Sequence, residues 1–335
     1  MNLLGRIEFP NLFDRDLNID RVAFNLFGIN IYWYGIIITA AVALGIFYAL
    51  KRANVVGVLP DNIFDVAFWG FITGILGARI YYVIFWNLNP ENLEKYDIVR
   101  TFTGFRDGGL AVYGGLIGAL IGAVLAAHIL KIRFIPILDL VGAGFLIGHS
   151  LGRWGNFVNQ EAFGAPTAGD LPWGMTGDVI IKHLSEAGMD TNALVHPCFL
   201  YESLWCALGL LLVHFYIKKF RSFDGEVFLL YLFWYGAGRA FIEGLRTDSL
   251  MLGDSNLRVS QVLAIASAVF ALMLFAYFKF TLTAKKGYVL YKNSDESKQT
   301  VENHRYNIRL NREKEDAKKV LKRLQKENRN NGENS

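Results

Sequence analysis

The residues best suited to chemistry are an arginine, two asparagines and a carboxylate that lie close together in one polar run. Arg153, Asn156, Asn159 and Glu161 fall within the run 152–164, which follows an apolar stretch. An arginine donates two parallel hydrogen bonds to a phosphate, and asparagine amides add neutral donors. The run is therefore suited to binding an anionic phosphate group. An interfacial loop with an arginine anchor and a tryptophan is the alternative interpretation.

More ionisable residues lie inside apolar stretches. A charged side chain at the centre of a bilayer costs about 3 kcal/mol on insertion scales, so such residues usually mark a functional site. Here they are Arg79, Glu202, Arg239 and Glu243. Snorkelling to the interface or structural pairing is the alternative for any single one. Other polar residues are expected at the same depth, and together they predict a shared polar cavity near the outer leaflet: Tyr34, Tyr113, Arg153, Tyr201, Ser260 and Gln261.

The composition indicates that a bilayer surrounds these stretches. Charged residues make up 19% of the 335 residues and hydrophobic residues 53%, whereas soluble proteins contain roughly 25% charged residues. This balance excludes a nucleic-acid binder and a disordered protein. A window of about 20 apolar residues is long enough to cross the hydrocarbon core as a helix. We expect seven such helices, at 31–50, 64–86, 108–130, 134–152, 197–217, 226–245 and 257–280.

Lysine and arginine residues in the short loops predict the orientation. They concentrate in the loops 51–63, 131–133 and 218–225, whereas the longer segments on the other side are sparsely basic. By the positive-inside rule these three loops are cytoplasmic. The expected fold class is an all-α integral membrane protein with seven transmembrane helices, the N-terminus outside, the C-terminus in the cytoplasm and a small extracytoplasmic head.

Three domains are predicted. Residues 1–30 form an extracytoplasmic or interfacial N-terminal segment, residues 31–282 the seven-span membrane domain, and residues 283–335 a basic cytoplasmic tail. Within the membrane domain, 153–196 is predicted to be an ordered head and 87–107 a more mobile arm. The tail holds 14 Lys and Arg residues against 8 Asp and Glu residues. A cationic amphipathic helix on the anionic inner leaflet and a solvated, disordered chain are both consistent with this composition.

Glycines at four-residue spacing predict close packing of the spans. They are Gly70 and Gly74, Gly114, Gly118 and Gly122, and Gly144, Gly148 and Gly152. The run 148–152 also satisfies the Gly-x-Ser-x-Gly pattern of hydrolases, with Ser150 as the nucleophile. That pattern requires a turn between a strand and a helix, and here it lies in a helical span. A transporter or channel is a further alternative, although polar residues confined to the outer half of the spans leave a conduction path incomplete.

The long polar run resembles the signature of the prolipoprotein diacylglyceryl transferases, bacterial membrane enzymes that begin lipoprotein maturation. The resemblance covers about residues 20–282 and leaves the tail outside. Six shorter motifs resemble the same family and follow its order: Tyr32-Trp33-Tyr34-Gly35, the run 107–116, the run 171–175, His196-Pro197 with Leu200-Tyr201-Glu202, Tyr235 with Arg239, Glu243 and Arg246, and Arg258 with Ser260-Gln261.

The resemblance implies transfer of the diacylglyceryl group of phosphatidylglycerol to the lipobox cysteine thiol of a prolipoprotein. A thioether forms and glycerol phosphate is released. The implied partners are phosphatidylglycerol, prolipoprotein signal peptides that carry a lipobox cysteine, and membrane lipids, with no nucleic acid. No cofactor and no metal are expected, and the implied location is the bacterial inner membrane.

Arg153 and Arg239 are the expected clamp on the leaving phosphate, because the transition state needs cations there. Tyr113, which stands where some family members carry a histidine, is the third expected catalytic residue. An unperturbed tyrosine is a poor base at neutral pH, so the identity of the proton acceptor stays open. The expected lipid-binding residues are Arg153, Asn156, Tyr34, Asn159, Glu161, Gly164, Tyr235, Glu243 and Arg246.

His196, Glu202 and Gln261 are expected to support the site. For His196 we consider both a structural hydrogen bond and proton transfer. Glu161, Glu202 and Glu243 are expected to orient the arginines by ion pairing, which fixes a guanidinium more firmly than packing does.

Overall fold

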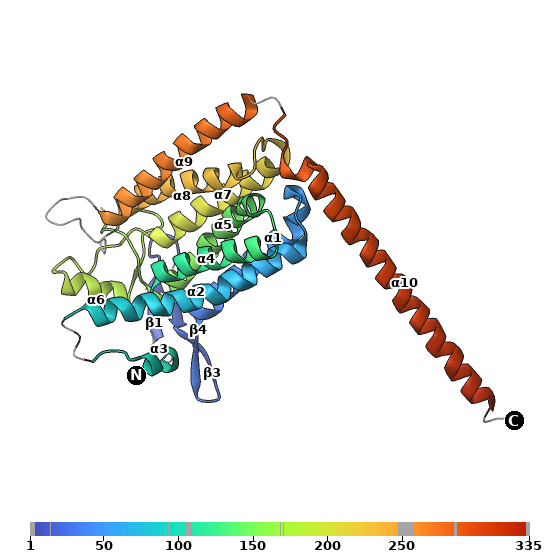
Figure 1. The fold of residues 1–335 in the computed structure, drawn as a ribbon. Coiled ribbons are helices and arrows are strands. Elements are labelled where there is room, and N and C mark those ends of the chain that lie inside the picture. Colours follow the sequence, from blue (N-terminus) through green and yellow to red (C-terminus); the bar gives the residue numbers. More distant parts are fainter. Residues whose placement is uncertain are drawn as a thin grey trace.

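A computed structural model describes residues 4–13, 15–90, 92, 94–104, 109–167, 169, 171–246, 258–284 and 287–332. Its main body is a bundle of long helices, with small strands and short helices at one end (Figure 1). The long helices are α1 (Trp33–Val56), α2 (Pro60–Leu88), α4 (Val112–Ile129), α5 (Phe134–Asn159), α7 (Cys198–Lys219), α8 (Glu226–Glu243) and α9 (Val259–Ala284).

Within the described part of the chain, six of these helices are long and apolar enough to cross a membrane. The seventh, α8, has 18 residues and carries Glu226, Arg239 and Glu243, and it is not among the six. The predicted helical integral membrane fold is therefore confirmed. The count of seven spans and their orientation stay predictions.

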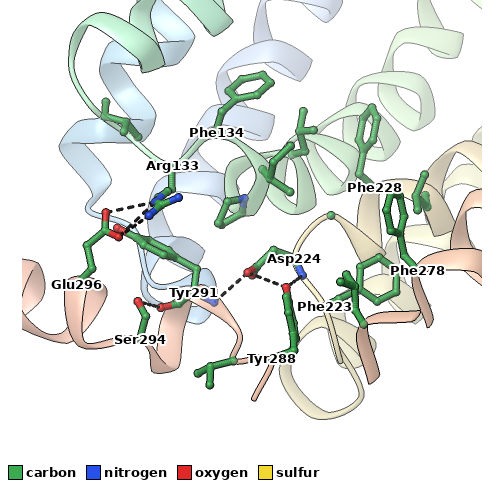
Figure 2. Close-up of a pocket in the computed structure, with 18 residues that line it drawn as sticks. Arg133, Phe134, Phe223, Asp224, Phe228, Phe278, Tyr288, Tyr291, Ser294 and Glu296 are labelled. Atoms are coloured by element: carbon green, nitrogen blue, oxygen red, sulfur yellow. Dashed lines mark hydrogen bonds and ion pairs between the residues drawn. The ribbon is translucent and has the colours of Figure 1, made fainter. Parts of the chain in front are cut away.

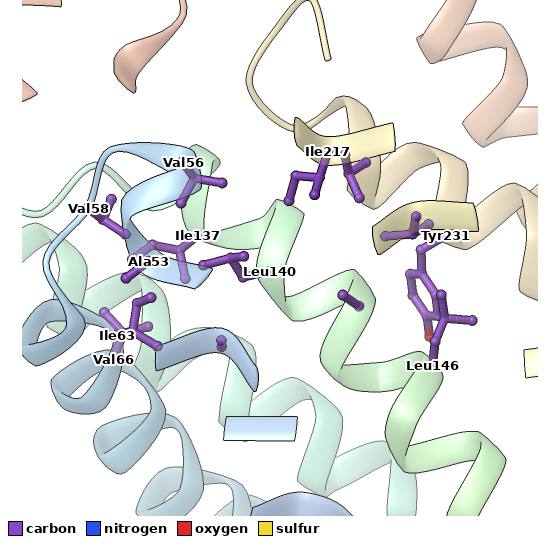
Figure 3. Packing of buried hydrophobic residues seen from close by; sticks show 14 of the residues in the cluster. Ala53, Val56, Val58, Ile63, Val66, Ile137, Leu140, Leu146, Ile217 and Tyr231 are labelled. Carbon is purple, nitrogen blue, oxygen red and sulfur yellow. The ribbon is translucent and has the colours of Figure 1, made fainter. Parts of the chain in front are cut away.

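A core at one end of the bundle joins α1, α5, α7 and α8 (Figure 3). Side chains at three- and four-residue spacing, such as Ile137 and Leu140, meet Ala53 and Val56 of α1 on one side. Ile217 of α7 and Tyr231 of α8 lie on the other side, and Ile63 and Val66 of α2 also belong to the cluster. This apolar layer holds the first half of α5 in one orientation between its neighbours. It therefore also sets the direction in which the side chains at the other end of α5 point.

Glycines let α2 and α4 approach closely. A Cβ atom on Gly77 would lie 2.5 Å from the carbonyl oxygen of Gly114 and 2.9 Å from Cα of Gly118, so neither backbone could keep its place if a side chain were added. The predicted packing role of Gly114 is confirmed. For Gly148 the prediction is wrong, because a Cβ there would meet nothing within 4 Å.

The all-α prediction missed five short strands. β1 (Leu4–Glu8) pairs with β2 (Leu17–Asp20) and with β5 (Thr176–Gly177), and β3 (Val22–Leu26) pairs with β4 (Ile29–Tyr32). Strands of two to five residues leave almost no alternating pattern to detect in a sequence. The β1–β5 pair also depends on residues about 170 positions apart, which local patterns do not reveal.

The N-terminal segment and the head fold as one unit. Ile7 of β1 packs with Phe157 of α5 and with Ile180 and Leu184 of α6 (Asp178–Glu186). Helix α5 also runs to Asn159, seven residues beyond its predicted end, so the first part of the expected head is helical. The predicted boundary at residue 30 therefore does not separate two independent cores.

The arm contains α3 (Ile98–Thr103), which begins where Asp97 accepts a hydrogen bond from the backbone of Arg100. Arg79 of α2 is buried and donates to the carbonyl oxygens of Thr101, at 2.8 Å, and Gly109, at 3.2 Å. The guanidinium of Arg79 is therefore turned toward the arm, and its place in the shared cavity stays a prediction. The arm's last residues, 105–107, lie outside the described residues, and its mobility stays a prediction.

Candidate active site

Three helices bring two arginines to one carboxylate. Arg153 lies near the end of α5, Glu202 near the start of α7, and Arg239 in the last turn but one of α8. Nη2 of Arg153 lies 2.6 Å from Oε1 of Glu202, and Nη1 of Arg239 lies 3.0 Å from Oε2. The Glu202 side chain is 3% exposed. One buried carboxylate thus holds two guanidinium groups side by side.

A second carboxylate extends this cluster toward α9. Oε2 of Glu243 lies 2.6 Å from Nη2 of Arg239 and 4.0 Å from Nη1 of Arg246. Ser260 of α9 donates to Oε1 of Glu243 at 2.5 Å, and Gln261 donates to the carbonyl oxygen of Ala240 at 2.9 Å. The expected roles of Glu202 and Glu243 in orienting arginines agree with these contacts.

The polar run at the end of α5 forms the other edge of the cluster. Nη1 of Arg153 donates to Oδ1 of Asn156 at 3.1 Å, and Nδ2 of Asn156 donates to Oε1 of Glu161 at 2.9 Å. Asn159 donates to the same oxygen at 3.4 Å. Glu161 therefore orients two amides, and the expectation that it pairs with an arginine is wrong for the described contacts. Tyr34 of α1 packs against Gly155, where a Cβ would lie 2.6 Å from its ring.

Gly164 joins the head to this region. It forms a β-bridge with Arg246, and its backbone N–H donates to the carbonyl oxygen of His196 at 2.8 Å. A Cβ at this position would lie 2.7 Å from Cβ of His196 and 2.9 Å from Cys198. Glycine is required because the two backbones approach this closely.

A layer of aromatic rings lies one helical turn deeper than the arginines. His149, four residues before Arg153, stacks on Tyr235, four residues before Arg239, with ring centroids 4.1 Å apart. Nε2 of His149 lies 3.1 Å from the Tyr231 hydroxyl, and the Tyr235 hydroxyl donates to Glu202 at 3.4 Å. The sequence analysis missed this role of His149, although four-residue spacing places it on the face of Arg153.

Two expected residues do not join the cluster. Tyr113 is the second residue of α4, which packs mainly on α2, and Tyr113 is 63% exposed. Nδ1 of His196 lies 3.1 Å from the hydroxyl of Tyr201, which also accepts from Trp173 at 2.8 Å. Burial lowers the pKa of His196. This contact favours the structural role for His196.

Ser150 has no catalytic surroundings. It lies inside α5 and donates to the backbone oxygen of Ser203 at 3.0 Å. The strand and turn that a nucleophilic serine of this pattern requires are replaced by continuous helix. Nowhere in the described ranges do three His, Cys, Asp or Glu side chains come together to hold a metal ion.

Comparison with known proteins places this geometry in a family. The model of the prolipoprotein diacylglyceryl transferases matches residues 21–277. The chain belongs to the prolipoprotein diacylglyceryl transferase family. Relatives named phosphatidylglycerol–prolipoprotein diacylglyceryl transferase include a Clostridioides difficile protein, 39% identical over 77% of this chain and 95% of its own length. The Finegoldia magna relative is 42% identical over 76% and 94%, and the Listeria innocua relative 42% over 77% and 90%.

Membership of the prolipoprotein diacylglyceryl transferase family confirms the resemblance described from the motifs. Together with the six apolar helices, it makes the chain a multi-pass protein of the bacterial inner membrane and an enzyme of the transferase class. The matched residues include α1 to α8 and most of α9, whereas the basic tail lies outside them.

Proposed function

We propose that this chain transfers the diacylglyceryl group of phosphatidylglycerol to the lipobox cysteine of prolipoproteins. The names of its relatives supply both substrates. The observation that carries the proposal is the pair of guanidiniums held by Glu202. Two cations fixed side by side suit a phosphate that gains charge as its ester bond breaks.

Arg153 and Arg239 bind the phosphate in this proposal. The cysteine thiol loses its proton to solvent, its sulfur attacks the glyceryl carbon, a carbon–sulfur bond forms, and the carbon–oxygen bond to the phosphate breaks. Glycerol phosphate leaves with the bonding electrons. Because Glu202 already holds both guanidiniums, little side-chain entropy is lost when the transition state forms.

The remaining polar groups around the arginines bind the head group. We assign this role to Tyr34, Asn156, Asn159, Glu161, Gly164, Tyr235, Glu243 and Arg246, with His196 and Gln261 in support. An apolar groove of about 340 Å³ between α8 and α9 includes Ala240 and Gln261 in its wall, next to Arg239. It suits an acyl chain, because its lining is almost entirely aliphatic or aromatic.

Tyr113 is assigned to the thiol. Its exposed position at the start of α4 makes it accessible to a substrate held in the membrane. The Tyr113→Phe variant removes only the hydroxyl. We expect a lower kcat with an unchanged KM for the lipid, measured by product mass over time. Undiminished turnover would remove the phenol from the chemistry.

The proposed topology has seven spans, with α8 as the seventh, and an outside N-terminus. The basic residues Lys51, Arg52, Lys131, Arg133 and Lys218 support cytoplasmic loops at 51–63, 131–133 and 218–225. The proposed domains are the membrane domain 31–282, with the segment 1–30 folded onto its head, and the cytoplasmic tail from 283. Labelling of cysteines introduced at Asn30 and Lys218 with a membrane-impermeant reagent on intact cells tests the orientation: position 30 should react and position 218 should not.

The decisive experiment mixes purified protein, phosphatidylglycerol and a lipobox peptide, and detects the thioether by mass. We expect Arg153→Ala and Arg239→Ala to lower kcat by about 100-fold or more, as loss of a transition-state donor does. The Glu202→Gln variant should lose about 10- to 100-fold, because it positions both arginines. Arg305→Ala, on an exposed part of the tail, is the matched control. No product with the unaltered protein, or full activity of both arginine variants, would overturn the proposal.

A further inference from the structure

The first part of the tail, which follows α9, packs against the bundle before the long helix of the tail begins. Asp224, in the loop before α8, accepts from the backbone of Tyr291 at 2.9 Å and from the Tyr288 hydroxyl at 3.2 Å (Figure 2). Arg133, at the start of α5, pairs with Glu296 at 2.9 Å. We call residues 288–297 the strap. It fastens the start of the tail to the same end of the bundle as the basic loops.

The last contact of the strap fixes the first turn of the tail helix. Oγ of Ser297 donates to the carbonyl oxygen of Gly57, just after α1, at 2.6 Å. Ser297 is the third residue of α10 (Asp295–Gly332), a helix of 38 residues. At 1.5 Å per residue it is about 57 Å long. Its origin is therefore tied to the end of a membrane span.

The tail helix runs across the direction of the spans. In Figure 1, α10 leaves the end of the bundle and does not continue the direction of α1 or α9. A helix that leaves the end of a membrane bundle crosswise follows the membrane surface, because the spans themselves stand across the bilayer. This direction keeps α10 close to one leaflet along its length.

One face of α10 can be assigned from its first turns. Ser297 is buried and Val301 and His304 are half-buried, so this face is turned toward the rest of the protein. At three- and four-residue spacing the same face continues through Ile308, Glu315, Lys319 and Lys322, all of them exposed. Beyond the strap, the face that points toward the membrane side therefore carries Lys319 and Lys322, with Glu315 and Ile308 beside them.

The charge of the helix matches an anionic surface. Residues 298–332 hold eleven Lys and Arg residues against five Asp and Glu residues. Basic residues next to a span are attracted by anionic lipids of the cytoplasmic leaflet, by about 1 kcal/mol each when they are near the surface. A basic helix that is attached at the membrane interface and runs across the direction of the spans stays close to such lipids.

We propose that α10 rests on the anionic lipids of the cytoplasmic leaflet, held by the face that includes Lys319 and Lys322. The tail lies outside the residues matched by the transferase family, so this contact is separate from the proposed reaction. It rests on the proposed orientation, which places this end of the bundle in the cytoplasm.

The test compares two faces of the helix in the full-length protein. The variants Glu315→Cys and Glu313→Cys each remove one negative charge, and the two positions lie on opposite faces of α10. The native cysteines, Cys198 and Cys206, are buried and so do not compete for the label. Each variant is labelled with a nitroxide and placed in nanodiscs of phosphatidylcholine with or without phosphatidylserine. We expect a water-soluble nickel chelate to reach the label at 315 several-fold less than the label at 313, only when phosphatidylserine is present and salt is low.

Charge variants give the matched control. Removing two surface-facing lysines, in Lys319→Gln with Lys322→Gln, should lower the bound-to-free ratio of the helix by about 30-fold, from the contribution of each lysine near an anionic surface. Arg309→Gln with Lys314→Gln removes the same charge from other faces and should have a smaller effect.

Three results would overturn the proposal. The two labels could be equally accessible in every disc, or protection could be independent of lipid charge. Protection of the label at 313 that grows with the number of protein copies per disc would instead indicate a second copy on the opposite face of α10, where Tyr306, Val320 and Leu321 lie. Lipid transfer measured separately with phosphatidylglycerol and a lipobox peptide, and the labelling of positions 30 and 218, separate these outcomes from failure of the proposed function or orientation.

Discussion

At the level of single residues, Glu202 is the carboxylate that holds the two active-site arginines together. Its two oxygens each contact a different arginine, and its side chain is almost completely buried. Without it, two guanidiniums would repel each other in surroundings that screen poorly. Removing one partner of a buried ion pair costs about 3–5 kcal/mol, because the remaining charge is left uncompensated. The geometry of Arg153 and Arg239 therefore depends on a residue that need not touch the substrate.

His196 gives the head a pH dependence. Burial lowers its pKa in the folded protein, while in the unfolded chain it titrates near 6.5. The unfolded chain then binds more protons between the two values, so stability is present above about pH 6.5 and is lost as the pH falls below it. We expect the unfolding temperature of the head to drop between pH 7.5 and 5.5, and to drop less in His196→Gln. Hydrogen exchange in the peptides that hold Trp173 and Tyr201, which bond each other, reports it.

An identical pH dependence in His196→Gln and in the unaltered protein would assign the acid sensitivity to other groups. His183 of α6 lies in the same head and serves as a control, because its ring packs edge-on against Phe163. We expect His183→Gln to retain the pH dependence.

The arginines and Glu202 could be predicted from the sequence because a charge inside an apolar span is costly and therefore informative. Arg79 obeys the same rule, yet its guanidinium binds arm carbonyls. Depth along a helix does not reveal which face a residue occupies relative to the other helices. His149 and Tyr231 were missed for a different reason, since aromatic residues in a span usually indicate packing.

At the scale of elements, the N-terminus of α8 is capped by a carboxylate that belongs to another helix. Asp139 of α5 accepts from the backbone N–H groups of Gly225, Val227 and Phe228, at 2.9 to 3.2 Å, and pairs with Arg221 at 2.9 Å. A helix N-terminus leaves such donors without partners inside the helix, and its dipole favours a negative charge. This buried contact sets the position of α8, and through it the position of Arg239.

Asp139→Asn is therefore expected to destabilise the bundle by about 3–5 kcal/mol, since Arg221 loses its buried counter-charge. Thermal unfolding in detergent measures the effect. Asp61→Asn, an exposed carboxylate in the first turn of α2, is the matched control and should change stability by less than about 1 kcal/mol. Equal melting temperatures for Asp139→Asn and the unaltered protein would contradict this account of α8.

Most ends of the long helices could be predicted from the sequence to within about four residues, whereas the short strands could not be predicted. Apolar windows of 20 residues leave a strong pattern, and α4, α7 and α8 follow it, whereas α1 runs six residues beyond its predicted end. The predicted end of α5 lies before the observed one, because the last turns of this helix are polar and lack the apolar pattern of a span. These turns are helical in the structure, where they pack against the folded head. Pairing of β1 with β5 was beyond reach because it joins distant segments.

At the scale of the whole molecule, the strap ties three segments at one end of the bundle. Its contacts reach Gly57, Arg133 and Asp224. A chain that ends after residue 286 should melt several degrees lower, because each lost hydrogen bond contributes about 1 kcal/mol. A chain that ends after residue 304 keeps the strap and should melt like the full protein.

Transfer activity at low temperature should survive both truncations, since the active-site cluster lies at the other end of α5. Differential scanning calorimetry and the thioether assay measure the two properties. A loss of activity in the chain that ends after residue 304 would contradict this separation of tail and active site.

The charge count of the arginine cluster has a consequence for product release. Arg153, Arg239 and Arg246 face Glu202 and Glu243, which leaves this described cluster with one net positive charge. A phosphodiester carries one negative charge and makes the site neutral, whereas a phosphate monoester carries about 1.5 to 2. Attraction grows in proportion to ligand charge, but the cost of removing an ion from water grows with its square. We therefore expect the site to bind the lipid more tightly than the glycerol phosphate that the reaction releases.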